Sequence, residues 1–220
     1  MAIANIRAKT DDAELVERRR AQFVTAAIDL FGERGYHATT IRDIAERAQV
    51  SIGLIYHYFE DKEDLLFLAL VEVLDSYQRQ IPSALEGIKE PIARFSAAVR
   101  AYCHVNDVAV DATVLAYRET KSLSRQRRDL IKQKECDTNE LIAACIRDCL
   151  AAKLFHAAVD IELLTYQIVM FSHAWALKAW QFRPRMTVDN YVDRGLRLML
   201  HAVVTPAGAR RLAALERRGR

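Results

Sequence analysis

Residues 39–66 read TTIRDIAERAQVSIGLIYHYFEDKEDLL, and this stretch decides the fold. Thr40 is followed three residues later by Asp43, which is a variant of the capping box that begins many helices. A break follows, and its last residue, Ser51, is placed to cap a second helix over 52–59. Two short helices joined by a tight turn predict a helix-turn-helix.

An amphipathic helix precedes this pair. Its apolar side chains recur at i, i+3, i+4, i+7 and i+8, a spacing that places them on one face of a helix. They are Phe23, Ala26, Ala27, Leu30 and Phe31. Gly32 and Gly35 then lie where a left-handed cap is expected to end the helix.

The helix over 52–59 has two different faces. Ile55, Tyr58 and Phe59 share one face and are expected to pack against the first two helices. The opposite face carries small, apolar and aromatic side chains, which suit insertion into the major groove, where methyl groups and base edges are met. These residues are Gly53, Leu54, Tyr56 and His57.

Contacts with DNA phosphates are expected beside this helix. The two helix N-termini offer free N–H groups and the positive end of a dipole, and nearby hydroxyl groups and one lysine add further donors. Such contacts fix the position on DNA, whereas Arg42, Leu54 and His57 are better placed to read bases. The predicted DNA-binding residues are Thr39, Thr40, Arg42, Ser51, Ile52, Gly53, Leu54, Tyr56, His57 and Lys62. The alternative is that 39–62 forms three packed helices of a larger bundle that reads no DNA.

Composition gives this interpretation no help. The 220 residues are 51% hydrophobic and 28% charged, as in ordinary folded proteins. The net charge is only +3, and acidic residues outnumber basic ones over residues 1–65. Because bulk charge does not indicate a nucleic-acid binder, the prediction rests on the geometry of the motif.

Other features of the sequence bear on where the protein works. No apolar run is long enough to suggest a membrane span, and Met1–Arg20 lacks the apolar core of a secretory signal. We therefore expect a cytoplasmic protein with no membrane partner. The four cysteines are then expected to be reduced thiols.

Parts of residues 27–66 resemble the TetR family. Residues 39–45 resemble the second helix of that family, and 54–66 resemble its recognition helix and the entry to its fourth helix. Upstream, Ala27-x-x-Leu30-Phe31-x-x-x-Gly35-Tyr36 matches the end of the family's first helix.

Two positions depart from the family pattern. Gln49 stands in the turn where the family usually has glycine, and Ile52 is unusual at the start of a recognition helix. A residue with a side chain enters the left-handed region only at a cost, so we expect a slightly reshaped turn. Ile52 is expected to shift the preference among operators.

The resemblance implies an all-α protein with an N-terminal three-helix helix-turn-helix domain and a larger helical domain that binds a ligand and dimerises. We place the DNA-binding domain at 15–63, the ligand-binding and dimerisation domain at 64–205 and a short, basic, peripheral tail at 206–220. Helical periodicity predicts a fourth helix that begins at Asp61 and ends near Pro82. Further helices are predicted over 91–105, 108–121, 124–153, 160–182 and 187–203.

The last two of these helices are the predicted dimer interface. The helix over 160–182 is apolar on more than one side, and Gly195 in the next helix allows close approach of another helix. Such a pair meeting its two-fold copy would form a four-helix interface, so we expect a homodimer through about 160–203. The alternative is that both helices complete the core of a monomer.

The resemblance also implies a small-molecule inducer. The segments 117–123, 175–180 and 184–187 are similar to TetR-type regulators that respond to acyl-CoA esters. Basic side chains at 118–128 are expected to meet phosphates, with an apolar channel for the acyl chain; the alternative is a solvated helix face. The predicted ligand-binding residues are Tyr102, Arg118, Lys121, His173 and Trp175, and the predicted phosphate contacts also include Arg125, Arg127 and Arg128.

Catalysis and metal binding have little support. We find no glycine-rich phosphate loop and no GxSxG or HExxH motif, so no enzyme and no cofactor is predicted. Cys145 and Cys149 lie one turn apart and would need Cys103 or His104 to hold a soft metal, but no CxxC pair supports this site.

The prediction is a homodimeric repressor that a small ligand releases from a palindromic operator of double-stranded DNA. Activation of transcription remains open. The competing class is a helical protein-interaction adaptor that reads no DNA.

Overall fold

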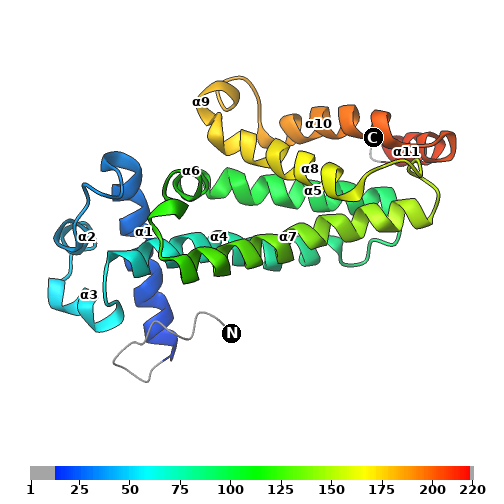
Figure 1. The fold of residues 1–220 in the computed structure, drawn as a ribbon. Helices are drawn as coiled ribbons and strands as arrows, with labels where there is room; N and C mark the ends of the chain where they lie inside the picture. The colour runs from blue at the N-terminus through cyan, green and yellow to red at the C-terminus, as the bar shows by residue number, and fades with distance from the viewer. Residues whose placement is uncertain (1–12, 219–220) are drawn as a thin grey trace. The chain divides into compact units, whose positions relative to one another are not determined.

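The computed structural model describes residues 13–218, and the chain is all-α as predicted (Figure 1). Met1–Arg20, where we expect no secretory signal, lies mostly outside the described residues. The helices are α1 (Ala13–Arg34), α2 (Ile41–Arg47), α3 (Ile52–Tyr58), α4 (Lys62–Leu85), α5 (Pro91–Val108), α6 (Val110–Glu119), α7 (Arg125–Ala151), α8 (Ile161–Leu177), α9 (Ala179–Phe182), α10 (Val188–Val203) and α11 (Pro206–Arg218). A short 3-10 helix, Thr120–Ser122, precedes α7.

The chain divides into two compact units. Unit 1 contains the residues up to 73 together with 111–134, and unit 2 contains 74–110 together with the residues from 135 onward. α4 and α7 therefore each contribute residues to both units. The domain limits drawn from the sequence, 15–63 and 64–205, stay a prediction.

The core of unit 1 forms where α1 meets α3. Phe23 of α1 is fully buried, and its ring centroid lies 5.7 Å from that of Tyr58 and 6.1 Å from that of Phe59. Ile55 and Ile44 are also fully buried. The predicted packing face of the recognition helix is therefore confirmed.

The turns of unit 1 follow the backbone chemistry expected from the sequence. Gly35 directly follows α1 and ends that helix with a φ of 86°, whereas Gly32 lies inside the helix. Gln49 has a φ of 56°, so it does enter the left-handed region in the turn between α2 and α3. Two backbone hydrogen bonds close α2 at this point, from Gln49 to Glu46 and from Val50 to Ala45.

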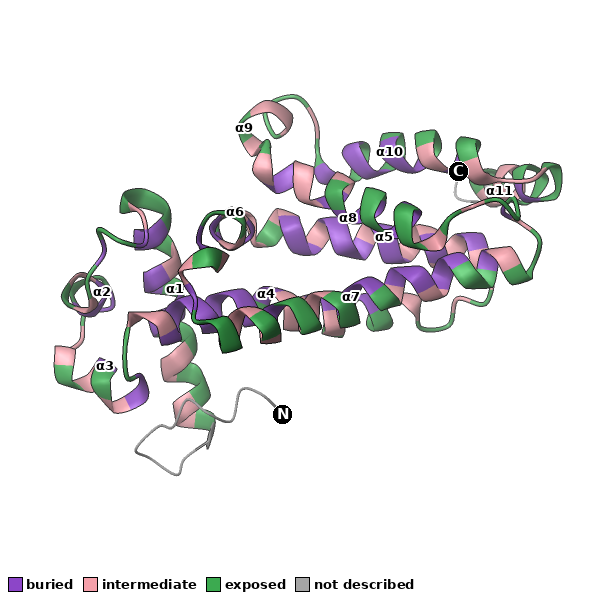
Figure 2. Ribbon diagram, in the orientation of Figure 1, coloured by how far each residue is buried: buried purple, intermediate pink, exposed green. Residues whose placement is uncertain are grey.

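In unit 2, α5 packs against α8, α10 and α11. Figure 2 shows buried residues along the length of α5. Gly195 of α10 allows α8 to approach closely, because a Cβ atom at this position would overlap the ring of Phe171. That ring stacks on Tyr191 with a centroid separation of 4.4 Å. The predicted role of Gly195 is confirmed.

The segment after Pro206, which we predicted to be a short, basic, peripheral tail, is helical. It forms α11, with Pro206 in the first turn, where a missing N–H leaves no bond unmade. The Thr205 hydroxyl accepts a hydrogen bond from the Gly208 N–H, and Gly208 is buried against the Leu154 carbonyl. α11 therefore has a cap and a buried contact within unit 2; residues 219–220 lie outside the described residues.

Two other boundaries differ from the sequence pattern. The predicted helix over 160–182 is broken at Lys178, whose φ of −121° and ψ of 30° separate α8 from α9. α4 continues past Pro82 to Leu85, because a proline in the last turn removes only one backbone hydrogen bond. Among the described helices, none has the length and apolar character that a membrane crossing requires.

Candidate DNA-binding surface and ligand-binding core

The capping box at the start of α2 is present. The Thr40 hydroxyl accepts a hydrogen bond from the Asp43 N–H at 3.2 Å, and the Asp43 carboxylate accepts one from the Thr40 N–H at 2.7 Å. The hydrogen bonds from Thr40 hold the pKa of Asp43 below its usual value. Because these groups already bond to one another, Thr40 offers fewer free donors than the sequence suggested.

The outward face of α3 is open. Ser51 caps the helix by accepting a hydrogen bond from the Leu54 N–H at 3.2 Å. Tyr56 is 51% exposed, and a Cβ atom added at the exposed Gly53 would find open space. The partly exposed side chains of Ile52, Leu54 and His57 complete this face. Arg42, which lies on α2, is exposed.

Two predicted DNA contacts have other roles in the structure. The Thr39 side chain is fully buried, and its hydroxyl donates to the Gly35 carbonyl at 2.9 Å. The Lys62 ammonium donates to the Tyr36 and Thr39 carbonyls at 2.6 and 2.7 Å and lies 4.4 Å from the Tyr36 ring centroid. Burial lowers the pKa of Lys62. Both residues hold the chain between α1 and α2, so neither side chain is available to a phosphate as placed here.

The first turn of α4 is fixed by a set of charged side chains that form ion pairs or hydrogen bonds, which we call the α4 junction: Lys62, Glu63, Asp64 and Arg127. The Asp64 carboxylate is 2% exposed and pairs with the Arg127 guanidinium, which also lies 3.2 Å from Glu63. Asp64 accepts a hydrogen bond from the Glu60 N–H at 2.6 Å, and Glu63 accepts one from the Ser124 N–H at 2.9 Å. The junction therefore fixes the segment that leads out of α3.

Two of the predicted phosphate contacts, Arg127 and Arg128, have partners within the protein. Arg127 pairs with carboxylates, and Arg128 donates to the carbonyls of Lys121 and Leu123 at 3.0 and 2.9 Å. Both guanidinium groups are thus used within the protein. Nothing in the local sequence signals that Arg127 meets Asp64, because the two lie far apart in the chain.

Three of the five predicted ligand residues lie in unit 2. The Tyr102 hydroxyl is 3.4 Å from Nε2 of His173, and the Tyr102 ring stacks on Tyr77 at 4.1 Å. Burial lowers the pKa of His173 to about 4, so its imidazole is neutral at neutral pH. Trp175 is buried and donates from Nε1 to Asp107 at 2.8 Å.

The other two predicted ligand residues belong to unit 1. Arg118 ends α6 and Lys121 lies in the 3-10 helix, and both are exposed. Tyr102 and His173 thus lie together in unit 2, whereas Arg118 and Lys121 belong to the other unit.

The sequence did not predict a chain of buried hydrogen bonds in unit 2. The Tyr77 hydroxyl donates to Oδ1 of Asn106 at 2.8 Å, and Nδ2 of Asn106 donates to the Ser172 hydroxyl at 3.0 Å. All three residues are buried. The chain links α4, α5 and α8, and it satisfies its members internally, as buried polar groups require.

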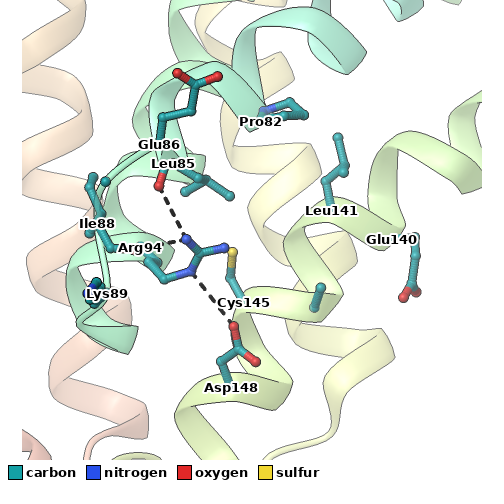
Figure 3. A pocket seen from close by; sticks show the side chains of 12 residues that line it. Pro82, Leu85, Glu86, Ile88, Lys89, Arg94, Glu140, Leu141, Cys145 and Asp148 are labelled. Carbon is teal, nitrogen blue, oxygen red and sulfur yellow. Dashed lines mark hydrogen bonds and ion pairs between the residues drawn. The ribbon is translucent and has the colours of Figure 1, made fainter.

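An open pocket of about 600 Å³ lies between the end of α4, the start of α5 and α7 (Figure 3). Its walls include Leu85, Ile88 and Leu141. The Arg94 guanidinium bonds to the carbonyls of Leu85 and Ile88 at 3.2 and 2.9 Å and pairs with Asp148. None of the five predicted ligand residues lines this pocket, so it does not support the predicted site.

Three of the four cysteines are buried, and Cys136 is exposed. Burial raises the pKa of Cys103 and of Cys149 to about 12, which keeps these thiols protonated at neutral pH. As placed in the described residues, they act as small apolar side chains of unit 2.

The predicted dimer helices expose large apolar side chains. Leu163, Tyr166 and Met170 of α8 are 57%, 45% and 50% exposed, and their spacing places them along one side of the helix. Leu198 of α10 is 77% exposed. The opposite side of α10 is buried within unit 2.

Comparison with known proteins agrees with this arrangement. Residues 23–69 match the family described as bacterial regulatory proteins, tetR family, and 89–202 match the tetracyclin repressor-like C-terminal domain. The HTH-type transcriptional regulator HbdR of Aromatoleum sp. (strain CIB) is 49% identical, covering 97% of this chain and 93% of its own. The HTH-type transcriptional repressor KstR2 of Rhodococcus jostii (strain RHA1) is 28% identical, covering 89% and 96%.

A solved structure shares the fold at lower sequence identity. It is AibR in complex with isovaleryl coenzyme A and operator DNA, which is 20% identical with a TM-score of 0.70 and covers 82% of this chain and 97% of its own. The family matches, the 49% identity to HbdR and the helix-turn-helix geometry agree, and the chain belongs to the TetR family of transcriptional regulators.

Proposed function

We propose that the protein is a homodimeric repressor that leaves a palindromic operator when an acyl-CoA ester binds in unit 2. The observation that carries the DNA-binding part is the outward face of α3, which is exposed and bears few charged groups. Small and aromatic side chains there suit contact with base edges and methyl groups in the major groove. The proposed contacts are Thr40, Arg42, Ser51, Ile52, Gly53, Leu54, Tyr56 and His57.

The dimer is proposed from the exposed apolar side of α8 together with Leu198 of α10. Clustered apolar side chains at the surface of a folded protein commonly mark an interface. A second copy would present the same residues, so the contact would be isologous. The two recognition helices would then address half-sites about 34 Å apart.

The ligand is proposed to occupy the interior of unit 2 near Tyr102, His173 and Trp175. A neutral imidazole beside a tyrosine hydroxyl offers polar contacts within an apolar core, a typical composition for a small-molecule site. The acyl-CoA class is supported by the isovaleryl coenzyme A in the AibR complex. A ligand that prefers one conformation shifts the protein toward it by its differential affinity.

The test uses DNA from upstream of the gene for this protein. We expect nanomolar, competitor-resistant binding by two protomers or a multiple of two, measured by fluorescence anisotropy at about 0.15 M salt. Substitution of Tyr56→Ala and His57→Ala together is expected to weaken operator binding at least about tenfold, because direct base contacts contribute about 1–3 kcal/mol each. The variant should remain a dimer with an unchanged melting temperature.

Other outcomes separate the alternatives. Unchanged operator affinity in the double variant would remove the proposed reading surface, and an adaptor without DNA readout would keep its partner binding in that variant. A titration with several acyl-CoA esters at micromolar concentration should release the wild-type protein from DNA. No release by any of them would reject the ligand class while leaving the DNA-binding proposal intact.

A further inference from the structure

One buried polar side chain in α7 has no partner. Asn139 is 6% exposed, and neither its Oδ1 nor its Nδ2 forms a hydrogen bond with any described residue. Buried amide groups in folded proteins are almost always hydrogen-bonded, and leaving one unpaired destabilises the fold. An unpaired group at this position therefore calls for a physical explanation.

The neighbouring buried polar groups of unit 2 are paired. Thr138, the residue before Asn139, accepts a hydrogen bond from Nε2 of Gln78 at 3.4 Å. Nδ2 of Asn106 donates to both the Ser172 hydroxyl and the Tyr102 carbonyl. The Thr165 hydroxyl donates to a backbone carbonyl at 2.7 Å. The unpaired amide is thus particular to Asn139 and does not reflect loose packing of polar groups in this unit.

A second polar group lies one helical turn before Asn139. Glu135 shares its face of α7, since residues four apart are neighbours on a helix surface. Burial raises the pKa of Glu135, and it has no ion pair among the described residues. Ile142 and Ile146 continue this face as fully buried apolar residues. α7 therefore presents a polar pair bordered by an apolar wall.

This face is separate from the pocket described above. Cys145, which lines that pocket, and Thr138 project from the other flank of α7, on the far side of Ile142. Figure 3 labels Cys145 among the side chains of the opening, and Asn139 is not one of the residues that line this pocket. The polar pair belongs to a different part of unit 2.

We propose that Asn139, with Glu135 beside it, binds a neutral hydrogen-bonding group of the effector, namely an amide or a hydroxyl. This inference rests on the proposed function, because it assigns residues to the effector of that same regulator. Such a group can donate a hydrogen bond to the carboxyl group of Glu135 and accept one from the Asn139 amide. A carboxylate fits less well, because it has no proton to donate to Glu135 and two carboxylates that are both ionised repel each other. A CoA ester carries amides in its pantetheine arm, and some acyl groups carry a hydroxyl.

The test replaces Asn139 by a residue of similar size that needs no hydrogen bond. Asn139→Leu is expected to raise the melting temperature by about 2–4 °C, because an unpaired buried amide is removed. It should keep wild-type operator affinity. Isovaleryl-CoA, hexanoyl-CoA and phenylacetyl-CoA are the probes. The concentration of an active ester for half-release from DNA should rise about two- to tenfold, the effect of one lost hydrogen bond of ordinary strength to a ligand.

Thr138→Val is the matched control, since it changes a neighbouring buried polar residue that is already paired. It should lower the melting temperature and leave release by the ester unchanged. Comparing hexanoyl-CoA with 3-hydroxyhexanoyl-CoA distinguishes the two sources of the polar group. If Asn139 contacts a hydroxyl, the wild-type protein prefers the hydroxylated ester and N139L loses that preference; if it contacts a pantetheine amide, N139L loses its response to both esters equally.

Two results would overturn the inference alone. A lower melting temperature for N139L would show that the amide has a partner within the folded protein. Release of N139L and wild-type protein at the same ester concentration would show that Asn139 does not contact the effector. If no ester releases the wild-type protein, the proposed ligand class fails and the inference, which rests on it, fails with it.

Discussion

In the α4 junction the buried Asp64 carboxylate has Arg127 and backbone N–H groups as partners, whereas in the middle of α7 the buried Asn139 amide has none among the described residues. The junction fixes the segment that leads out of the recognition helix. Such a geometry stays fixed when each buried polar group has a hydrogen-bond or ion-pair partner within the protein. A binding site instead keeps hydrogen-bonding capacity for a ligand and is less stable without it. The difference between the two regions is thus the difference between positioning and binding.

The largest expected effect on stability comes from removing an ion pair of the α4 junction. Arg127→Met leaves the buried Asp64 carboxylate without its cation, and removing one partner of a buried pair typically costs about 3 kcal/mol or more. Urea unfolding should show this loss, and operator affinity should fall because the exit from α3 is no longer fixed. The slope of affinity against salt should stay unchanged, since Arg127 is not expected to contact phosphates.

Arg128→Met is the control for this change. Within residues 13–218, Arg128 donates only to backbone carbonyls, so its loss should cost about 1 kcal/mol. Equal effects of the two substitutions would mean that the Arg127–Asp64 pair does not hold the junction.

The next prediction concerns a buried group that the protein keeps neutral. The pKa of His173 is lowered by burial from 6.5 to about 4, so below pH 6.5 the unfolded chain binds a proton that the folded chain does not. Stability should therefore fall as the pH drops from 6.5 toward 4, by up to about 3 kcal/mol from this residue. Above pH 6.5 the residue has no such effect.

His173→Gln isolates this contribution from those of the carboxylates. The variant should lose less stability than the wild-type protein between pH 6.5 and 4, measured by urea unfolding at several pH values. Parallel stability curves for the two proteins would show that the pKa of His173 is the same in the folded and the unfolded chain.

The sequence predicted the packing of α3 because burial there follows a local period. Ile55, Tyr58 and Phe59 recur on one face, and local spacing is enough to place them in the core. Pairing is different: Arg127 meets Asp64 from a distant part of the chain, so no local pattern reveals it. Periodicity in α7 likewise indicates that Asn139 is buried but says nothing about its partners.

Some of the predicted DNA contacts likewise follow from local periodicity, and others depend on how distant parts of the chain meet. The exposure of Tyr56 and Gly53 follows from the helical period, whereas the burial of Thr39 depends on how the chain turns after α1. The helix α11 was not predicted for a different reason. Thr205 and Pro206 are a capping signal that the basic character of the following residues obscured.

The smallest expected effect on stability comes from substitutions at two helix ends, one in each unit. Gln49 ends α2 with a φ of 56°, and Lys153 follows α7 with a φ of 57°. Both close their helices with the same pair of backbone hydrogen bonds. Glycine at either position relieves about 1–2 kcal/mol of left-handed strain but loses about 0.5–1 kcal/mol more backbone entropy on folding.

Gln49→Gly and Lys153→Gly should therefore each stabilise the protein by about 0.5 kcal/mol in urea unfolding. The two substitutions should differ in operator binding, because Gln49 lies in the turn that positions α3 whereas Lys153 lies in unit 2. Gln49→Gly is expected to change the relative affinities for operator variants, and Lys153→Gly is expected to leave them unchanged. If both variants bind all operators as the wild-type protein does, the shape of this turn does not contribute to operator choice, and the departure at Gln49 has no consequence for recognition.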